Sequence, residues 1–237
     1  MTYYLSKEIV TTEDGSPSLV FHTSEDKQMM HSFKGAYSET EYIYGAAIDK
    51  IIHLQKPKII SIGLGFGYCE LTVLVRLMQH SHYQIITYES EADLKQALIS
   101  YLQGEETEYT KQYVQIFSRY EEAYSLSTGS LKKVLLHAYE SEKWLLRESF
   151  DFQQTDELYN AILFDPFCSR FHAAVWEEKS LHTWLQHMAA DSCVFSTYAA
   201  KGDLKRSLKE LGFTLEKRPG FGLKRESTLA YRGIGPS

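Results

Sequence analysis

The stretch Lys58-Ile59-Ile60-Ser61-Ile62-Gly63-Leu64-Gly65-Phe66-Gly67 decides the fold of this 237-residue chain. Its first half is a short apolar run rich in β-branched isoleucine, which is typical of a buried strand. Three glycines at alternate positions follow, and the segment from Glu70 to Met78 then has helical character. The order strand, glycine turn and helix indicates the start of an alternating α/β domain, in which the missing side chains let the backbone approach a ligand closely.

The alternation continues on both sides of this turn. Helical spacing predicts a helix from Ser38 to Leu54 that ends before Pro57. The run Gln84 to Tyr88 predicts a second strand, followed by a helix from Ala92 to Gln103. Further strands are predicted at 133–137, 159–164 and 193–198, a helix at 202–211, and a closing hairpin from 213–217 and 226–231. We therefore expect an α/β fold with a mostly parallel sheet and an antiparallel C-terminal hairpin.

The rest of the chain predicts one globular domain with a small extension. Residues 1–37 contain short β-prone runs around the turn signal Glu13-Asp14-Gly15-Ser16-Pro17, so we expect a β-rich extension there and the main domain over residues 38–237. With 43% hydrophobic and 24% charged residues, the composition is that of a globular protein. No apolar run approaches the roughly 20 residues that span a bilayer, and the opening residues lack the plan of a signal peptide, so we expect a cytoplasmic protein without a membrane partner.

Charge is distributed unevenly along the sequence. The formal net charge is −6, but residues 201–232 hold nine Lys and Arg against four Asp and Glu. This basic C-terminal segment on an acidic body favours local contact with a polyanion.

The glycine turn and the end of the second strand together predict a cofactor site. The pattern Gly63-x-Gly65-x-Gly67 lacks the spacing of a dinucleotide-binding turn and the Lys-Ser/Thr of a triphosphate site. We therefore expect it to face the amino acid and ribose parts of S-adenosylmethionine. Glu89 ends the next strand, where an acid in nucleotide-binding sheets accepts hydrogen bonds from the ribose hydroxyls.

Two other strand ends carry acidic candidates. Asp165 follows the strand at 159–164 and is the best catalytic candidate, because a carboxylate at the carboxyl edge of the sheet orients an amine and offsets the charge that develops on it. A role as a helix cap is its alternative. The predicted strand at 133–137 places Tyr139 and Glu140 at its end, where Glu140 would reach the adenine edge or remain a surface carboxylate.

Other chemistries have little support in the sequence. His182 and His187 lie five residues apart and no carboxylate completes a metal triad with them, so we expect no metal. No Gly-x-Ser-x-Gly turn occurs, which disfavours covalent catalysis.

Several motifs resemble the methyltransferase domain of the tRNA 5-methylaminomethyl-2-thiouridine biosynthesis proteins. The matching motifs are Phe213-Thr214-Leu215-Glu216-Lys217-Arg218-Pro219-Gly220-Phe221-Gly222-Leu223-Lys224-Arg225-Glu226, Thr12-Glu13-Asp14-Gly15-Ser16, His31-Ser32-x-x-Gly35-Ala36, Glu39-Thr40-Glu41-Tyr42-Ile43-Tyr44-Gly45 and Ile62-Gly63-Leu64-Gly65-Phe66-Gly67. They extend over nearly the whole chain.

The resemblance implies a Rossmann-like class I methyltransferase fold, S-adenosylmethionine as methyl donor and the amine of a tRNA wobble aminomethyluridine as acceptor. It implies that Gly63, Gly65, Gly67 and Glu89, with Glu41 and Glu140, contact the cofactor and that Asp165 is the catalytic carboxylate. The family's flavin-dependent oxidase half has no counterpart in the sequence, so we expect no FAD.

The residues after Asp165 depart from the family pattern. Family members usually have a Lys-Asn-Pro stretch before the Trp, whereas this chain has Asp165-Pro166-Phe167-Cys168-Ser169-Arg170-Phe171-His172-Ala173-Ala174-Val175-Trp176. Phe167 is a candidate for stacking on the uracil base, with core packing as its alternative.

The closing hairpin predicts contact with tRNA. Its candidates are Lys217, Arg218, Lys224 and Arg225 for phosphates and Phe221 for stacking, with a solvated charged hairpin as the alternative. Two other functions stay open at this point, a small-amine methyl- or aminopropyltransferase of the same fold and a non-catalytic module that binds RNA or a partner.

Overall fold

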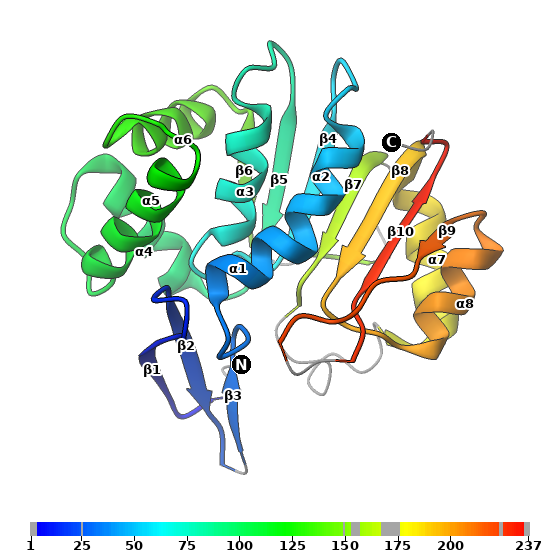
Figure 1. Cartoon of the computed structure of the whole chain (residues 1–237), viewed down its shortest axis with the longest axis horizontal. Helices are drawn as coiled ribbons and strands as arrows, with labels where there is room; N and C mark the ends of the chain where they lie inside the picture. Colours follow the sequence, from blue (N-terminus) through cyan, green and yellow to red (C-terminus); the bar gives the residue numbers. More distant parts are fainter. Residues whose placement is uncertain are drawn as a thin grey trace.

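A computed structural model describes residues 4–24, 26–148, 150–152, 157–166, 176–222 and 225–234. The strands of its large sheet are β4 (Lys58–Ile62), β5 (Gln84–Tyr88), β6 (Trp144–Arg147), β7 (Tyr159–Phe164), β8 (Ala189–Thr197), β9 (Thr214–Glu216) and β10 (Thr228–Arg232). They lie in the order β6-β5-β4-β7-β8-β10-β9 (Figure 1). The first five strands in this order, β6 to β8, pair in parallel, while β10 is antiparallel to both β8 and β9. The predicted mostly parallel sheet with an antiparallel C-terminal hairpin is confirmed.

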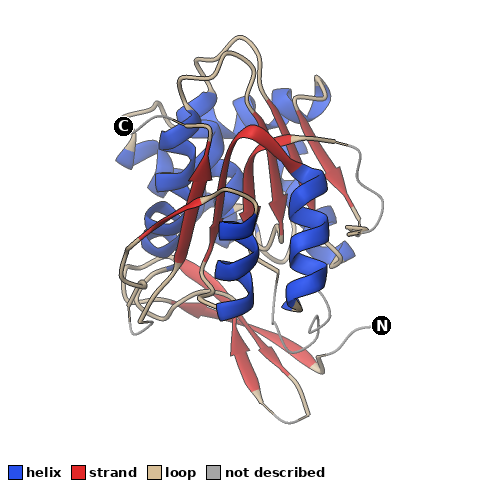
Figure 2. Ribbon diagram, turned by 90° about the vertical axis from the view of Figure 1, so that its right-hand side faces the viewer, coloured by secondary structure: helices blue, strands red, loops and turns tan. Residues whose placement is uncertain are grey.

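Helices cover both faces of this sheet (Figure 2). They are α1 (Ala36–Thr40), the π-helical segment η1 (Glu41–Gly45), α2 (Ala46–Ile51), α3 (Tyr68–Leu77), α4 (Ala92–Gln103), α5 (Thr110–Ala123), α6 (Ser130–Glu140), α7 (Glu178–Met188) and α8 (Gly202–Glu210). Because side chains alternate along a strand, Ile59 packs with residues of α2, α3 and α6, whereas Ile60 packs with residues of α7 and α8. The two cores explain why the central strands are apolar on both faces.

The predicted strand at 133–137 is wrong, because these residues lie inside α6. Leu131, Leu135 and Ala138 are buried at the i, i+4 and i+7 spacing of a helix, and a five-residue apolar run does not by itself separate a strand from a buried helix. The third parallel strand is β6. Since α6 leads into β6, Tyr139 and Glu140 lie at the amino edge of the sheet, opposite the edge where β4 and β7 end.

The N-terminal residues form a separate three-stranded antiparallel sheet of β1 (Ser6–Thr11), β2 (Pro17–His22) and β3 (Lys27–Met29). Asp14 in the turn after β1 accepts hydrogen bonds from the backbone amides of Ser16 and Ser38, each at 3.0 Å. Leu19 and Phe21 of β2 are buried in the same apolar cluster as α3. The extension is therefore fastened to the start of α1, and the domain boundary after residue 37 stays a prediction.

In the described parts of the chain, no helix has the length and apolar character needed to cross a membrane.

One carboxyl group lies fully inside the core beneath the glycine turn. Glu70 of α3 accepts a 2.8 Å hydrogen bond from the Thr87 hydroxyl, which in turn accepts one from the Trp144 indole at 3.0 Å. Burial raises the pKa of Glu70 from 4.5 to about 7. The folded protein therefore holds a proton on Glu70 at pH values where the unfolded chain has released it.

This proton makes the stability of the fold depend on pH. Because the folded-state pKa of Glu70 is raised, its protonation adds to the free energy of unfolding at low pH. This contribution is fully present below about pH 4.5 and is lost as the pH rises to about 7. At about 1.4 kcal/mol per pKa unit, the loss is about 3 kcal/mol. Glutamine cannot titrate, so the Glu70→Gln variant should not lose this free energy as the pH rises. In urea unfolding, its free energy of unfolding should therefore rise by about that amount relative to the wild-type value between pH 4.5 and 8. The exposed control Glu105→Gln should follow wild type, and parallel curves for Glu70→Gln would contradict the prediction.

Candidate functional site

A cavity of about 500 Å³ lies at the carboxyl edge of the sheet, where β4, β5 and β7 end. This edge is where open α/β sheets bind ligands, and the volume lies in the range of small-molecule sites. Its wall includes Gly63, Leu64 and Gly65 of the glycine turn, Tyr68 and Cys69 of α3, Glu89 after β5, Asp165 after β7, Tyr198 after β8, Glu39, Thr40, Ile43 and Tyr44 of α1 and η1, and Met30, His31, Ser32 and Phe33 after β3. The structure thus brings together Gly63, Gly65, Glu89 and Asp165, as the sequence predicts.

Glu89 holds the glycine turn against the end of β5. Its Oε2 accepts hydrogen bonds from the backbone amides of Leu64 at 2.9 Å and Gly65 at 3.1 Å. Its Oε1 accepts one from the Glu91 amide at 2.9 Å. A carboxylate has about four lone-pair sites, so Glu89 keeps capacity for a ligand hydroxyl on the cavity side.

The glycines let three chain segments meet at one point. A Cβ atom on Gly63, whose φ is +101°, would lie 2.3 Å from the carbonyl oxygen of Asp165. A Cβ on Gly65, whose φ is +53°, would lie 2.6 Å from the Met30 sulfur. The ends of β4 and β7 and the N-terminal extension therefore need glycine at these positions. Gly67 is the N-cap of α3 and is outside the cavity wall.

Asp165 stands beside the glycine turn. Its backbone amide donates to the Ile62 carbonyl at 2.9 Å, which continues the pairing of β7 with β4. The hydroxyl of Tyr198 donates to the carbonyl of Pro166 at 3.3 Å and so holds the segment after β7 near the end of β8. Phe167, together with the rest of the divergent stretch at 167–175, lies outside the described residues.

The described part of the cavity wall is acidic. Its described wall carries the carboxyl groups of Asp26, Glu39, Glu89 and Asp165, and these described wall residues include no Lys or Arg. Such a wall complements a ligand with positive charge or amine hydrogens. In the described segments, no three His, Cys, Asp or Glu side chains are grouped so as to hold a metal ion.

Glu41 takes part in a network outside the described cavity wall. Its carboxylate pairs with Arg76 of α3 at 2.9 Å and accepts hydrogen bonds from the hydroxyls of Thr72 at 2.8 Å and Tyr124 at 2.7 Å. These contacts join η1 to α3 and to the end of α5. Tyr139 and Glu140, at the opposite edge of the sheet, are also outside the described cavity wall, so the contacts of these three residues with the cofactor stay predictions.

The C-terminal hairpin contains two kinds of basic residue. The Arg218 guanidinium lies 3.9 Å from the centre of the Tyr42 ring and donates to the Tyr42 carbonyl at 2.6 Å, so it fastens the hairpin to η1. Phe221 packs beside the same ring, with 6.0 Å between ring centres. Lys217 and Arg225 are exposed, while Lys224 lies outside the described residues.

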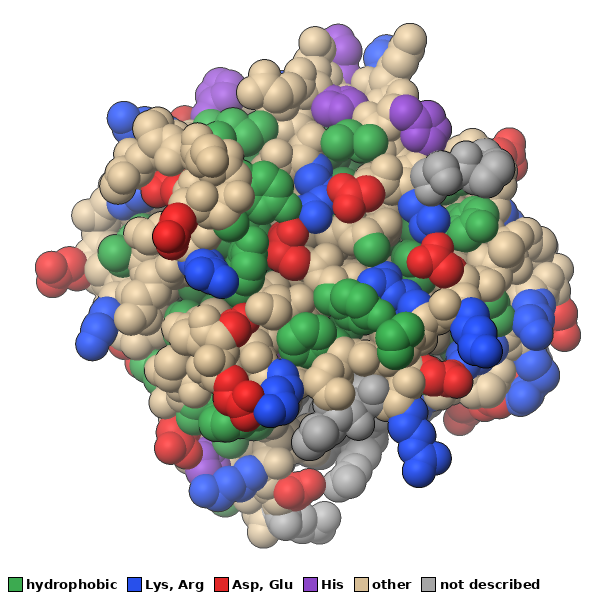
Figure 3. All heavy atoms as spheres, viewed as in Figure 1, with side chains coloured by type: hydrophobic (Ala, Val, Ile, Leu, Met, Phe, Trp, Pro, Cys, Tyr) green, Lys and Arg blue, Asp and Glu red, His purple; other side chains and the backbone are tan. Residues whose placement is uncertain are grey.

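Lys217 borders a basic groove, and the sequence predicted only some of the basic residues in its wall. Lys205 and Lys209 of α8 join Lys217 and Arg218 around a cavity of about 250 Å³. Glu216 and Glu226 also line it and form ion pairs with Lys50 and Lys205. On the face in Figure 3, Lys and Arg side chains gather over the region of α8 and β9.

Sequence reasoning missed Tyr44, Tyr198 and Met30 as cavity residues. Tyr198 follows a parallel strand, so the shared carboxyl edge of the sheet was a usable signal for it. Met30 and Tyr44 reach the cavity from elements outside the sheet, and their sequence carried no signal of that contact.

Known proteins are similar to this chain in sequence and in fold. Residues 105–233, more than half of the chain, match the family described as S-adenosyl-L-methionine-dependent methyltransferase. The tRNA 5-methylaminomethyl-2-thiouridine biosynthesis bifunctional protein MnmC of Pseudoalteromonas atlantica is 28% identical over 242 residues, which cover 92% of this chain and 32% of that protein. The MnmC protein of Campylobacter hominis is 22% identical over 207 residues, covering 86% and 30%.

A solved structure extends this similarity to the fold. The crystal structure of MNMC2 from Aquifex aeolicus matches with a TM-score of 0.67 and 21% identity, covering 98% of this chain and 73% of that one. The chain spans about a third of the length of the MnmC proteins that it matches. It therefore belongs to the S-adenosyl-L-methionine-dependent methyltransferase family that includes the methyltransferase part of the MnmC proteins.

Proposed function

We propose that this protein methylates the aminomethyl nitrogen of 5-aminomethyl-(2-thio)uridine at the wobble position of tRNA, with S-adenosylmethionine as methyl donor. The observation that carries the proposal is the acidic cavity in which the glycine turn, Glu89 and Asp165 meet. The names of the MnmC relatives support the choice of acceptor.

The residues of the cavity fit the cofactor. S-adenosylmethionine carries a positive sulfonium and an ammonium group, which the acidic wall complements, and it supplies an electrophilic methyl group when bound. Glu89 is placed to accept hydrogen bonds from ribose hydroxyls in addition to those from the turn. Gly63 and Gly65 expose backbone to the amino acid part.

Asp165 acts on the acceptor amine. The neutral nitrogen forms a bond to the methyl carbon as the carbon–sulfur bond breaks, so the nitrogen becomes an ammonium and then releases a proton to water. The Asp165 carboxylate accepts a hydrogen bond from the amine, which orients the lone pair, and its charge offsets the positive charge that develops.

The basic groove suits the phosphates of tRNA. Lys209 of α8 and Lys217 of the hairpin are exposed and line the same groove. Lysines that neutralise phosphates supply a sequence-independent part of nucleic-acid affinity. A small amine has no use for such a surface, so the groove favours tRNA over the small-amine alternative.

The glycine turn is tested by cofactor binding. In Gly65→Val the branched side chain would occupy the cavity and strain a left-handed backbone, so calorimetry should show at least a tenfold loss of S-adenosylmethionine affinity. Gly104→Ala is the matched control, because Gly104 also has a positive φ, of +93°, but has open space around it. Equal affinities in wild type and Gly65→Val would remove the turn from the site.

Asp165 is tested by turnover on the proposed substrate. Wild type, labelled S-adenosylmethionine and tRNA carrying aminomethyluridine should yield labelled methylaminomethyluridine after digestion of the tRNA. Asp165→Asn should lower the maximal rate by about a hundredfold with cofactor affinity almost unchanged, because it removes one preorganised charge that matters only as the methyl moves.

The control for Asp165→Asn is Asp191→Asn, which changes an exposed carboxylate at the amino edge of the sheet and should keep the wild-type rate. Asn caps helices as well as Asp does. Near-normal turnover of Asp165→Asn would therefore refute the catalytic role of Asp165 and leave helix capping as its role. No labelled nucleoside from wild type would refute the proposed function itself.

The basic groove is tested by the salt dependence of tRNA binding. Removing both charges in Lys209→Ala with Lys217→Ala should shallow the slope of log affinity against log salt by about one to two, as expected if each residue neutralises a phosphate. Lys111→Ala with Lys133→Ala removes the same charge from exposed positions on α5 and α6, at the other end of the sheet, and should leave the slope unchanged. Equal slopes for the two double variants would exclude the groove as a tRNA-binding surface.

A further inference from the structure

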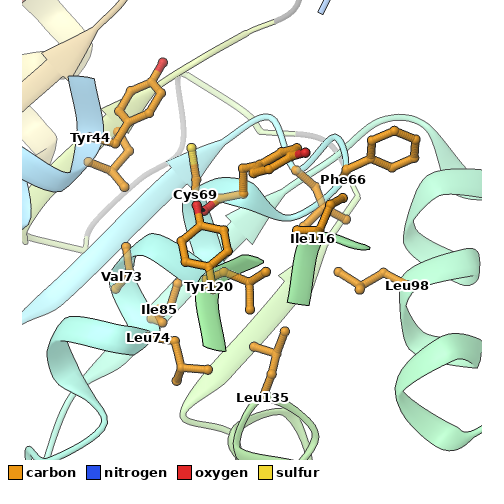
Figure 4. Packing of buried hydrophobic residues seen from close by; sticks show 14 of the residues in the cluster. Tyr44, Phe66, Cys69, Val73, Leu74, Ile85, Leu98, Ile116, Tyr120 and Leu135 are labelled. Atoms are coloured by element: carbon orange, nitrogen blue, oxygen red, sulfur yellow. Dashed lines mark hydrogen bonds between the residues drawn. The ribbon is translucent and has the colours of Figure 1, made fainter. Parts of the chain in front are cut away.

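One aromatic side chain is exposed in the described part of the chain, and it belongs to the cavity wall. Phe33, between β3 and α1, is 54% exposed, whereas the other described Phe, Tyr and Trp residues are buried or half-buried. Phe66 and Tyr120, for example, lie inside the apolar cluster of Figure 4. Because Phe33 is exposed and also lines the cavity, it lies at the mouth, where the cavity opens to solvent.

The backbone that carries the Phe33 ring is held on both sides. The Phe33 carbonyl accepts a 2.8 Å hydrogen bond from the amide of Glu13, in the turn after β1. The Ser32 amide donates to the Glu39 carboxylate at 2.6 Å. The Lys34 ammonium forms an ion pair with Glu13 at 2.7 Å. The ring is therefore carried by a fixed segment, which reduces the entropy lost when a ligand packs against it.

The tip of the C-terminal hairpin lies against the same segment (Figure 1). A Cβ atom on Gly222 would lie 2.9 Å from the Ser32 hydroxyl oxygen and 3.0 Å from Lys34 Cγ. The Gly220 amide donates to the Arg225 carbonyl at 3.1 Å, which places the exposed Arg225 on this tip. The mouth therefore has an acidic wall on its inner side and a basic side chain nearby. This combination fits a nucleotide that carries an amine on its base and phosphates on its backbone.

The chemistry of the proposed acceptor requires its base at the cavity wall. The aminomethyl nitrogen is joined to C5 of the uracil ring through a single methylene, so the ring must lie close to the wall when the nitrogen reaches Asp165. The wobble nucleotide belongs to a single-stranded loop, and proteins commonly stack the bases of such loops on aromatic side chains. An exposed ring also gains free energy when a base covers its apolar surface.

We propose that the Phe33 ring stacks on the uracil base of the acceptor nucleotide and so directs the aminomethyl group toward Asp165. This inference rests on the proposed function. The hairpin residue Phe221 is less suited to this contact, because it is half-buried and packs beside the Tyr42 ring. Phe33 takes no part in the transfer of the methyl group, and its contribution is to bind and orient the base.

Phe33→Ala and Phe33→Leu test this contact kinetically, with Phe33→Trp as the conservative variant. Stacking on one aromatic ring is worth about tenfold or more, so the first two variants should lower kcat/KM on aminomethyluridine tRNA by about that factor, mainly through KM. Phe33→Trp should stay within about twofold of wild type, because indole also offers a flat face. Wild-type kcat/KM in Phe33→Leu would overturn the proposal, since leucine keeps the apolar bulk without a ring.

Leu158→Ala is the matched control for these variants. Leu158 is 56% exposed and precedes β7 at the opposite edge of the sheet, so its truncation also removes exposed apolar surface but does so far from the cavity mouth. It should keep the wild-type kcat/KM. Affinity for S-adenosylhomocysteine should stay within about twofold of wild type in every variant. A tenfold loss of that affinity in Phe33→Ala would overturn the proposal, because the ring would then serve the cofactor.

The salt dependence of tRNA binding separates stacking from an indirect effect on the hairpin. Stacking releases no counterions, so the log affinity of Phe33→Ala should lie about one unit below that of wild type at every salt concentration, with the same slope. A ring that only held the basic hairpin in place would make the slope shallower when removed, because phosphate contacts would be lost. A shallower slope would therefore overturn the proposal.

A binding measurement separates this inference from the proposed function. The probes are an anticodon stem–loop RNA with uridine at the wobble position and the same RNA with an abasic nucleotide there. Wild type and Leu158→Ala should bind the uridine form about tenfold more tightly, whereas Phe33→Ala should bind both forms equally. If this difference is found but wild type fails to methylate aminomethyluridine tRNA, the acceptor assignment is wrong and the role of Phe33 stands. A preference that is kept in Phe33→Ala, or absent in wild type, refutes the role of Phe33 by itself.

Discussion

The close approach of Gly63 to the backbone of Asp165 is the constraint on which the site depends. With any other residue at position 63, a Cβ would lie 2.3 Å from the Asp165 carbonyl oxygen, so the ends of β4 and β7 could not meet as they do. Glu89 then holds the next two amides of the turn from the end of β5. One backbone contact and one carboxylate thus bring the ends of three parallel strands to a common cavity.

The remaining walls come from segments that are distant in sequence. Met30 of the N-terminal extension lies against Gly65, and the Glu39 carboxylate accepts the Ser32 amide at 2.6 Å, which joins this segment to α1. Tyr42 then links η1 to the C-terminal hairpin. The extension therefore forms part of the described cavity wall, and the hairpin is joined to η1, which supplies Ile43 and Tyr44 to that wall.

Two buried polar groups near the cavity lower the stability of the fold. Glu70 keeps its proton because burial disfavours its charge, and the Tyr44 hydroxyl has no partner among the described residues. Neither is the choice that would maximise stability, since an apolar replacement of similar shape removes the cost. For Glu70, the structure shows a role in bonding Thr87 beneath the turn.

The sequence by itself determined β4, β5 and β7, the glycine turn, and the positions of Glu89 and Asp165. A local sequence pattern predicts each of these features: an apolar run, glycines at alternate positions, or an acid directly after a strand. A local pattern failed at residues 133–137, because a short apolar run looks the same in a strand and in a buried helix such as α6. Only the tertiary structure decided that Glu41 pairs with Arg76, that Arg218 packs on Tyr42 and that Tyr44 is part of the cavity wall. The physical reason is that a side chain's partners depend on which elements pack together, and this packing is not encoded in the spacing of residues within one segment.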